Sequence, residues 1–266
     1  MGKLSAALER HQQEKTIKAK PLSTEGPQPD TVVMNRLDPR LVVCSAPGSL
    51  EAENFKVLKS QILFPKQGSS PRVVMVTSAL PGEGKTFVAA NLAVSLAQGV
   101  HEHALLMDCD FHHPNIHHML GYANKAGLQE YLTGKAQLSE LLIRTGIEKL
   151  SLLTAGVSVP DPSELLTSAT MKGLFEELKG RYPDRYIIVD SAPSHLMAEV
   201  SVLSNYVDGI IFVIKAGRAP RRIIDDAIER LGKEKIFGIV FNGYDKATKS
   251  YDSYYSKYYK KSNVGR

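Results

Sequence analysis

A short glycine-rich segment is the part of this chain whose residue types are best suited to chemistry. Its residues are Pro81, Gly82, Glu83, Gly84, Lys85 and Thr86, followed by Phe87. Glycines let backbone N–H groups turn toward phosphate oxygens, a lysine reaches the β and γ phosphates, and a threonine hydroxyl binds Mg²⁺. The G-x-x-x-x-G-K-[ST] pattern requires glycine where Ala79 stands, so one residue of the full motif is lacking. The segment predicts a nucleotide triphosphate site.

Three aspartates follow apolar runs that predict strands. Asp108 and Asp110 end the run 105–107, and Asp190 ends the run 187–189. Because sites in parallel sheets lie at the carboxyl ends of strands, we expect the three carboxylates to face the glycine-rich segment. Carboxylates placed there can bind Mg²⁺ and activate an attacking hydroxyl. Each aspartate alone is also typical of a turn or a cap, so the prediction depends on all three together.

The glycine-rich segment lies between a predicted strand at 73–76 and a predicted helix from Thr86 to about Gln98. Further strands are predicted at 104–107, 150–153, 186–189, 209–214 and 236–241. Further helices are predicted after an N-cap at Ser49, from Pro114, and at 163–180, 196–205 and 219–231. A strand-like run also leads from Thr31 to Leu41–Val43. Apolar strands separated by helices predict an α/β fold, in which a mostly parallel β-sheet is covered by helices on both faces.

The length of 266 residues suits one large α/β domain with tails. We expect a flexible N-terminal segment at 1–30, the domain at 31–245 and a tyrosine-rich C-terminal tail at 246–266. The longest apolar run, 209–214, is far shorter than a membrane span, and the start of the chain has no apolar signal region, so a cytoplasmic protein is expected. Cys44 and Cys109 lie in apolar runs and are interpreted as reduced core residues.

The basic charge lies in the two tails. Residues 1–20 carry +3 and residues 246–266 carry +5, so the net charge of +5 leaves the body near −3. Five of the eleven tyrosines also cluster in the C-terminal tail: Tyr251, Tyr254, Tyr255, Tyr258 and Tyr259. Such a cluster suits a phosphorylation substrate, and modifying all five would add about −7.5 to −10, which reverses the sign of the tail. The alternatives are solvated tails and an aromatic tail that docks on the body or a partner.

These motifs resemble those of the bacterial tyrosine kinases that control capsule and exopolysaccharide export. Segments 78–86, 105–114 and 187–193 are similar to the family's Walker A, Walker A′ and Walker B motifs. Segment 160–166 resembles its proline-rich stretch ahead of a helix, and segment 238–242 is similar to the strand whose asparagine, here Asn242, reads adenine. The resemblance runs from about Leu41 to the C-terminus and implies a P-loop NTPase fold.

The resemblance implies an ATP- and Mg²⁺-dependent protein-tyrosine autokinase that phosphorylates its tail tyrosines in trans. By analogy, Lys85 and Thr86 hold phosphate and Mg²⁺, Asp108 and Asp110 serve Mg²⁺ and the acceptor hydroxyl, and Asp190 holds the metal indirectly. The nucleotide site extends over residues 81–87 and Asn242. The resemblance further implies a transmembrane activator of the polysaccharide co-polymerase type, which recruits the chain to the inner face of the membrane, and a tyrosine phosphatase.

Two motifs depart from the family pattern. His112 stands where the family has an arginine that places a fixed charge near the phosphates. The E-x-x-R-x-x-R pattern that joins subunits in a ring appears as Glu53, Lys56 and Lys59, and lysine keeps the charge without the bidentate fork. The resemblance implies a homo-oligomer, and the two lysines put its assembly as a ring in doubt, so that such a ring is expected to be looser or absent.

Two other functions remain open. A switch ATPase of the partitioning or division-site type has the same fold, and the run Lys215, Arg218, Arg221 and Arg222 suits either DNA phosphates or a solvated helix start. Those ATPases carry a lysine where this chain has Leu80, and they need no tyrosine tail, so nucleic acid is not expected as a partner. The third function is a nucleotide-binding regulatory subunit with weak catalysis.

A histidine cluster invites a metal-site interpretation, since His113 and His117 are four residues apart. Pro114 favours a helix start between them, and no cysteine or carboxylate completes a zinc set nearby. Helix-start and surface roles are therefore expected for the four histidines His112, His113, His117 and His118.

Overall fold

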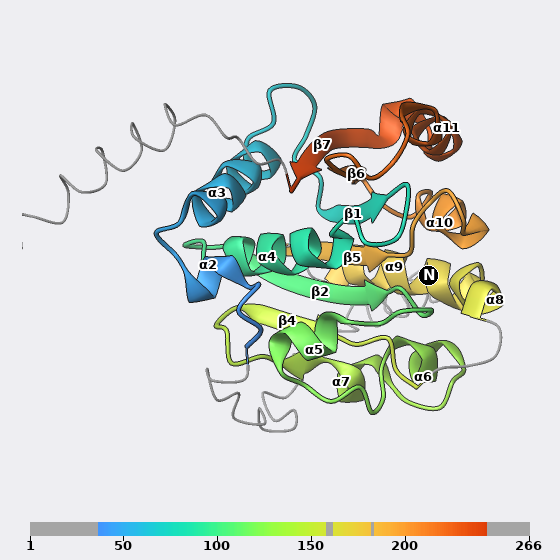
Figure 1. Cartoon of the computed structure of the whole chain (residues 1–266). Coiled ribbons are helices and arrows are strands. Elements are labelled where there is room, and N and C mark those ends of the chain that lie inside the picture. Colours follow the sequence, from blue (N-terminus) through green and yellow to red (C-terminus); the bar gives the residue numbers. More distant parts are fainter. Residues whose placement is uncertain (1–36, 158–161, 182–183, 244–266) are drawn as a thin grey trace, which may run out of the picture.

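The structure, a computed structural model, describes residues 37–157, 162–181 and 184–243 and centres on one seven-stranded sheet (Figure 1). Its strands are β1 (Val73–Ser78), β2 (His103–Cys109), β3 (Ile143–Arg144), β4 (Leu150–Leu153), β5 (Arg185–Ser191), β6 (Gly209–Lys215) and β7 (Ile236–Asn242). Their order is β3-β4-β2-β5-β1-β6-β7, and the pairs are parallel except β3 with β4. The predicted mostly parallel sheet is confirmed.

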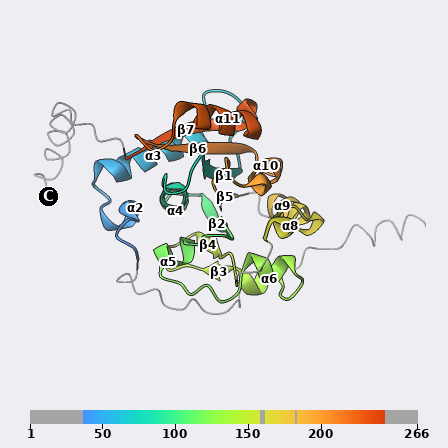
Figure 2. The ribbon, with the colours of Figure 1, turned by 45° about the vertical axis from the view of Figure 1, so that its right-hand side comes forward.

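Helices cover both faces of the sheet, as predicted, and Figure 2 shows the two layers on opposite sides of the strands. One face carries α2 (Val42–Ser45), α3 (Leu50–Leu63), α4 (Lys85–Ala97) and α5 (Ile116–Leu120). The other carries α6 (Leu128–Leu132), α7 (Leu138–Leu141), α8 (Pro162–Leu166), α9 (Ala169–Arg181), α10 (Ala198–Leu203) and α11 (Arg221–Leu231). A short 3₁₀ turn, η2 (Lys233–Lys235), leads into β7. Both layers protect the central strands from water, which is why these strands read as continuous apolar runs.

The core is divided by the alternation of the strands. On β2, Leu106 faces the α4 layer, whereas Leu105 and Met107 face the opposite layer. Helix α4 lies at the centre of its layer, and eleven of its thirteen residues are buried. Four of those residues are alanines, whose small side chains let the helix approach the sheet closely. The helix that begins at the glycine-rich segment is therefore fixed by packing along its whole length.

The prediction of a strand at Leu41–Val43 is wrong, because these residues lead into the one-turn helix α2. Leu41 and Val43 are buried against α4, so their apolar character reflects packing on a helix and not pairing in a sheet. Asn91 of α4 fixes this turn: its Oδ1 accepts from the Val43 N–H at 3.2 Å and its Nδ2 donates to the Arg40 carbonyl at 2.9 Å. A buried amide with both partners satisfied outweighs the β-propensity of a short valine run.

The helix expected at 163–180 is two helices, α8 and α9, which separate at Thr167 and Ser168. The Ser168 hydroxyl accepts from the Met171 N–H at 3.1 Å, as an N-cap does, and so starts a second helix. The helix expected from Pro114 begins two residues later, at Ile116. The short elements β3, α6 and α7 were not predicted, because two to five residues carry too little periodicity.

The helix cap predicted at Ser49 is confirmed. Ser49 accepts from the Ala52 N–H at 3.1 Å and caps α3. Cys44 and Cys109 are free, and Cys109 is buried whereas Cys44 is only partly so. Within the described residues, the helices are too short or too polar to cross a membrane.

Candidate active site

The glycine-rich segment forms a loop between β1 and α4 that only glycine can build at two points. Gly82 and Gly84 have φ angles of 78° and 98°, in the left-handed region. A Cβ on Gly84 would stand 2.1 Å from Nδ2 of Asn242, which in turn donates to the Glu83 carbonyl at 2.8 Å. The end of β7 therefore approaches this loop so closely that position 84 has no room for a side chain.

Glu83 fixes the loop from inside the fold. Its side chain is fully buried, and Oε2 accepts from the Leu80 N–H at 2.7 Å while Oε1 accepts from the Lys215 N–H at 3.3 Å. One carboxylate thus joins the turn of the loop to the end of β6. The sequence predicts only a nucleotide-contacting residue at this position. It does not reveal the hydrogen bond between Glu83 and β6, because Lys215 is far away along the chain.

The three aspartates gather on the face of the sheet that α4 covers. Asp108 of β2 and Asp190 of β5 are register partners, so their side chains point the same way. Asp110, two residues after Asp108, lies with its Oδ2 3.7 Å from Nζ of Lys85, the first residue of α4. The predicted approach of the strand ends to the loop is what the structure has. The roles of the individual residues stay predictions.

Asp108 is committed to the backbone of the segment that follows it. Oδ1 accepts from the Asp110 N–H at 3.2 Å, and Oδ2 accepts from the N–H groups of Asn115 and Ile116 at 3.1 and 3.2 Å. Burial raises the pKa of this carboxyl well above its ordinary value, and the charge of Asp190 raises it further. The geometry makes Asp108 the residue that shapes the turn before α5.

Asp190 has the opposite character, because neither of its buried carboxylate oxygens has a hydrogen-bond partner among the described residues. Burial raises its pKa to about 7, against the opposing influence of the Lys85 charge and the nearby Thr86 hydroxyl. A buried carboxylate with open oxygens next to a threonine hydroxyl fits a hard divalent cation or its bound water. In the described residues, no three His, Cys, Asp or Glu side chains are arranged to hold a metal by themselves.

The histidines occupy different environments. Nε2 of His112 lies 3.1 Å from Oε1 of Glu199, a residue of α10 that is only 4 % exposed. The His113 N–H donates to Oδ1 of Asp110 at 3.0 Å, so the backbone of this turn orients Asp110. The surface role expected for His117 is wrong, because its side chain is buried in the α4 layer. Its ring lies 4.0 Å from that of His118 between centroids, with the planes tilted by 41°, and burial lowers the pKa of His117.

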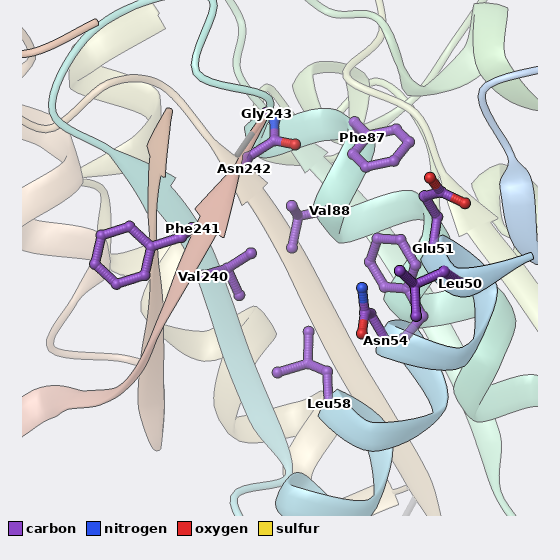
Figure 3. Close-up of a pocket in the computed structure, with 11 residues that line it drawn as sticks. Leu50, Glu51, Asn54, Leu58, Phe87, Val88, Val240, Phe241, Asn242 and Gly243 are labelled. Carbon is purple, nitrogen blue, oxygen red and sulfur yellow. The ribbon is translucent and has the colours of Figure 1, made fainter. Parts of the chain in front are cut away.

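A cavity of about 370 Å³ lies beside the glycine-rich segment 81–86, called the phosphate loop from here on. It is bounded by α3, the start of α4 and the end of β7. Figure 3 shows Phe87 and Asn242 at one end of this cavity and Leu58 at the other, whereas the ring of Phe241 points away from it. Its lining is mainly apolar, with Glu51 and Asn54 of α3 as polar groups at its side. A space of this size and character is suited to a flat heteroaromatic base.

The remaining predicted residues fall in three places. Glu53 and Lys56 form an ion pair within α3 at 2.5 Å, and Lys59 lies on the same helix. The prediction that these three join subunits stays open. Pro160 and Asp161 of the proline-rich segment lie outside the described residues, and so do the five tail tyrosines.

Comparison with known proteins gives consistent relatives. Residues 70–242 match the model of the ParA family, described as NUBPL iron-transfer P-loop NTPase. The chain is 33 % identical to the tyrosine-protein kinase YwqD of Bacillus subtilis over 223 residues, which cover 83 % of this chain and 93 % of that protein. It is 32 % identical to the succinoglycan biosynthesis transport protein ExoP of Rhizobium meliloti over 250 residues, 88 % of this chain but only 31 % of ExoP. The solved kinase domain of the Escherichia coli tyrosine kinase ETK superposes with a TM-score of 0.73 at 28 % identity, covering 81 % of this chain and 84 % of that one.

Proposed function

The chain belongs to the bacterial tyrosine kinase family, and from this premise we propose that it is a protein-tyrosine autokinase that regulates capsule or exopolysaccharide polymerisation and export. One observation carries the proposal: the glycine loop, Lys85, Asp110 and the open carboxylate of Asp190 meet at one edge of the sheet. This arrangement combines an anion-binding loop with acidic groups, as phosphoryl transfer requires. The alternative of a switch ATPase is not favoured, because the relatives are named tyrosine-protein kinases.

The family binds nucleotide, and we propose that the nucleotide here is ATP with Mg²⁺. The backbone of residues 81–87 would bind the phosphates, with Lys85 beside them and Thr86 and Asp190 holding the metal. Mg²⁺ supplies neutralisation of phosphate charge when bound. The cavity next to Phe87 and Asn242 would hold the base. Its position beside the loop supports this assignment, since base and phosphates must be bound within the length of one nucleotide.

Asp110 is the carboxylate best placed to accept the proton of a tyrosine hydroxyl. Its Oδ2 faces Lys85, and its Oδ1 is held by the His113 N–H. A carboxylate that the backbone orients beside the phosphate site can act as a general base toward an incoming hydroxyl. We assign to Asp108 the positioning of Asp110, because its own oxygens are bound to the backbone of the same turn. The acceptors would be the tail tyrosines 251–259 of another subunit.

We further propose a transmembrane activator that recruits the chain to the inner face of the membrane. The chain matches only a third of ExoP, so this relative joins the matched region to much additional sequence. Glu53, Lys56 and Lys59 on α3 are proposed to contribute to a homo-oligomer, and a tyrosine phosphatase would reverse the modification. Phosphorylation would reverse the charge of the tail, and this change would give the activator and the phosphatase a signal to recognise.

The test is incubation with ATP and Mg²⁺, followed by mass spectrometry of the C-terminal peptide and by measurement of released phosphate. We expect phosphate on tail tyrosines in the natural chain and none in Lys85→Met. Lys172→Met, an exposed change on α9, is the matched control and should label normally. Release of phosphate without labelling would instead identify a switch ATPase, and nucleotide binding with neither product would identify a regulatory subunit.

A further inference from the structure

The loop between β6 and α11 is fastened to the phosphate loop. Lys215, at the end of β6, donates its N–H to the buried Glu83 carboxylate at 3.3 Å. The Ala216 N–H donates to the Asn242 carbonyl at 3.0 Å. The side-chain amide of Asn242 in turn donates to the Glu83 carbonyl. These bonds fix the start of the β6–α11 loop relative to the residues that would surround the phosphates.

Arg218 lies in this loop and reaches over the phosphate loop. The nearest atoms to the point where a Cβ on Gly82 would stand are Nη2, Cζ and Nε of Arg218, at 3.2, 3.6 and 3.9 Å. All three belong to the guanidinium group, so the charged head of the side chain, and not its stem, lies at Gly82. Within the described part of the chain, this guanidinium has no hydrogen-bond or ion-pair partner.

Other basic side chains of the same run are placed differently. The stem of Lys215 lies near Gly243, with Cγ and Cε 3.5 Å from the point where a Cβ would stand. Arg221 is 94 % exposed on α11 and lies 3.6 Å from Asp225 of the next turn. The run is therefore not one continuous basic surface. Arg218 is the member of the run whose charged group lies beside a glycine of the phosphate loop.

We propose that Arg218 is a further residue of the phosphate site, whose guanidinium contacts the outer phosphate groups, β and γ, of the bound nucleotide. This inference rests on the proposed function. A guanidinium stays charged, and its fork of donors matches phosphate oxygens, so an unpaired one beside an anion-binding loop has a suitable ligand in a nucleotide. It adds a second cation to Lys85 at a loop whose Leu80 contributes none. His112, which also lies near this edge, is already paired with Glu199.

The test measures affinity and does not depend on kinase activity. The purified full chain is titrated with fluorescent methylanthraniloyl derivatives of AMP, ADP and a non-hydrolysable ATP analogue, each with Mg²⁺. For Arg218→Gln we expect Kd for ADP and for the ATP analogue to rise at least fivefold, with a smaller rise for AMP. Arg222→Gln, which removes the same charge from the first turn of α11, is the control and should stay within twofold of the natural chain.

Three results would overturn the assignment of Arg218. One is a Kd within twofold of the natural chain for all three nucleotides. Another is an equal loss in Arg222→Gln, which would indicate a general effect of net charge. The third is an equal loss for AMP and the ATP analogue, which would place the contact away from the outer phosphates. Failure of the natural chain itself to bind nucleotide would instead refute the proposed nucleotide site.

Discussion

Asp190 gives the sharpest prediction about stability, because its carboxylate is buried without a hydrogen-bond partner among the described residues. Its pKa is about 7 in the folded chain, against an ordinary value of 3.8. The folded state therefore keeps a proton that the unfolded chain has already released, and folding loses stability as the pH rises from about 4 to about 7. At about 1.4 kcal/mol per pKa unit, the full loss is on the order of 4 kcal/mol.

We therefore expect Asp190→Asn to stabilise the protein while abolishing tail phosphorylation. An asparagine fills the same space without a charge, so the variant should not lose stability across this window. Urea unfolding without nucleotide or Mg²⁺ should show a gain over the natural chain that grows by about 3 kcal/mol between pH 5 and pH 8. Asp225→Asn, at a 64 % exposed side chain, is the control and should change stability by less than about 0.5 kcal/mol at either pH.

The reasoning about Asp190 would be refuted by a variant that is less stable than the natural chain at pH 8. It would also be refuted by a gain that stays constant with pH, because a constant gain cannot come from titration of this group. Saturating ATP and Mg²⁺ should reverse the order, since only the natural chain offers the Asp190 carboxylate to the metal and gains the full binding energy.

Two further predictions concern the supports of the site. Gly84→Ala should lower the free energy of unfolding by about 1.5 to 3.5 kcal/mol and should abolish nucleotide binding. The loss has two parts, because alanine is strained in the left-handed backbone conformation and its Cβ displaces the Asn242 side chain from its hydrogen bond. Gly68→Ala, with φ of 74° and open space around it, should show only the backbone part, about 1 to 2 kcal/mol, in the same urea titration; equal losses would refute the close approach of β7. Asn91→Ala should cost about 2 to 3 kcal/mol, because the Val43 N–H and the Arg40 carbonyl lose a buried partner, and a loss below about 0.5 kcal/mol would contradict this packing.

The sequence predicts the sheet, the phosphate loop and the strand ends well because each depends on local signals. An apolar β-branched run followed by Pro81–Thr86 specifies strand, loop and helix within a few residues. Asp108 and Asp190 then meet because parallel strands end at the same edge. Helix N-capping by Ser49 likewise depends on only four consecutive residues, Ser49 to Ala52.

The features that the sequence did not reveal depend on contacts between distant residues. Arg218 looks like part of a basic helix start, and its position beside Gly82 follows from the hydrogen bonds that tie β6 and β7 to Glu83. The different environments of Asp108 and Asp190 are also invisible in the sequence, since both are aspartates at strand ends. Val43 looks like a strand residue until Asn91 is seen to hold it in a turn.

The central claim is that this site transfers phosphate to the tail tyrosines of another copy of the chain, and one mixing experiment tests it most directly. One partner is Lys85→Met, which keeps its five tail tyrosines, and the other is a chain whose tyrosines at 251, 254, 255, 258 and 259 are all changed to phenylalanine. Neither variant should become labelled alone with ATP and Mg²⁺. Mass spectrometry of the mixture should find phosphate on the tail of the Lys85→Met chain, whereas an unlabelled tail in the mixture, beside a natural chain that labels itself, would contradict transfer between subunits.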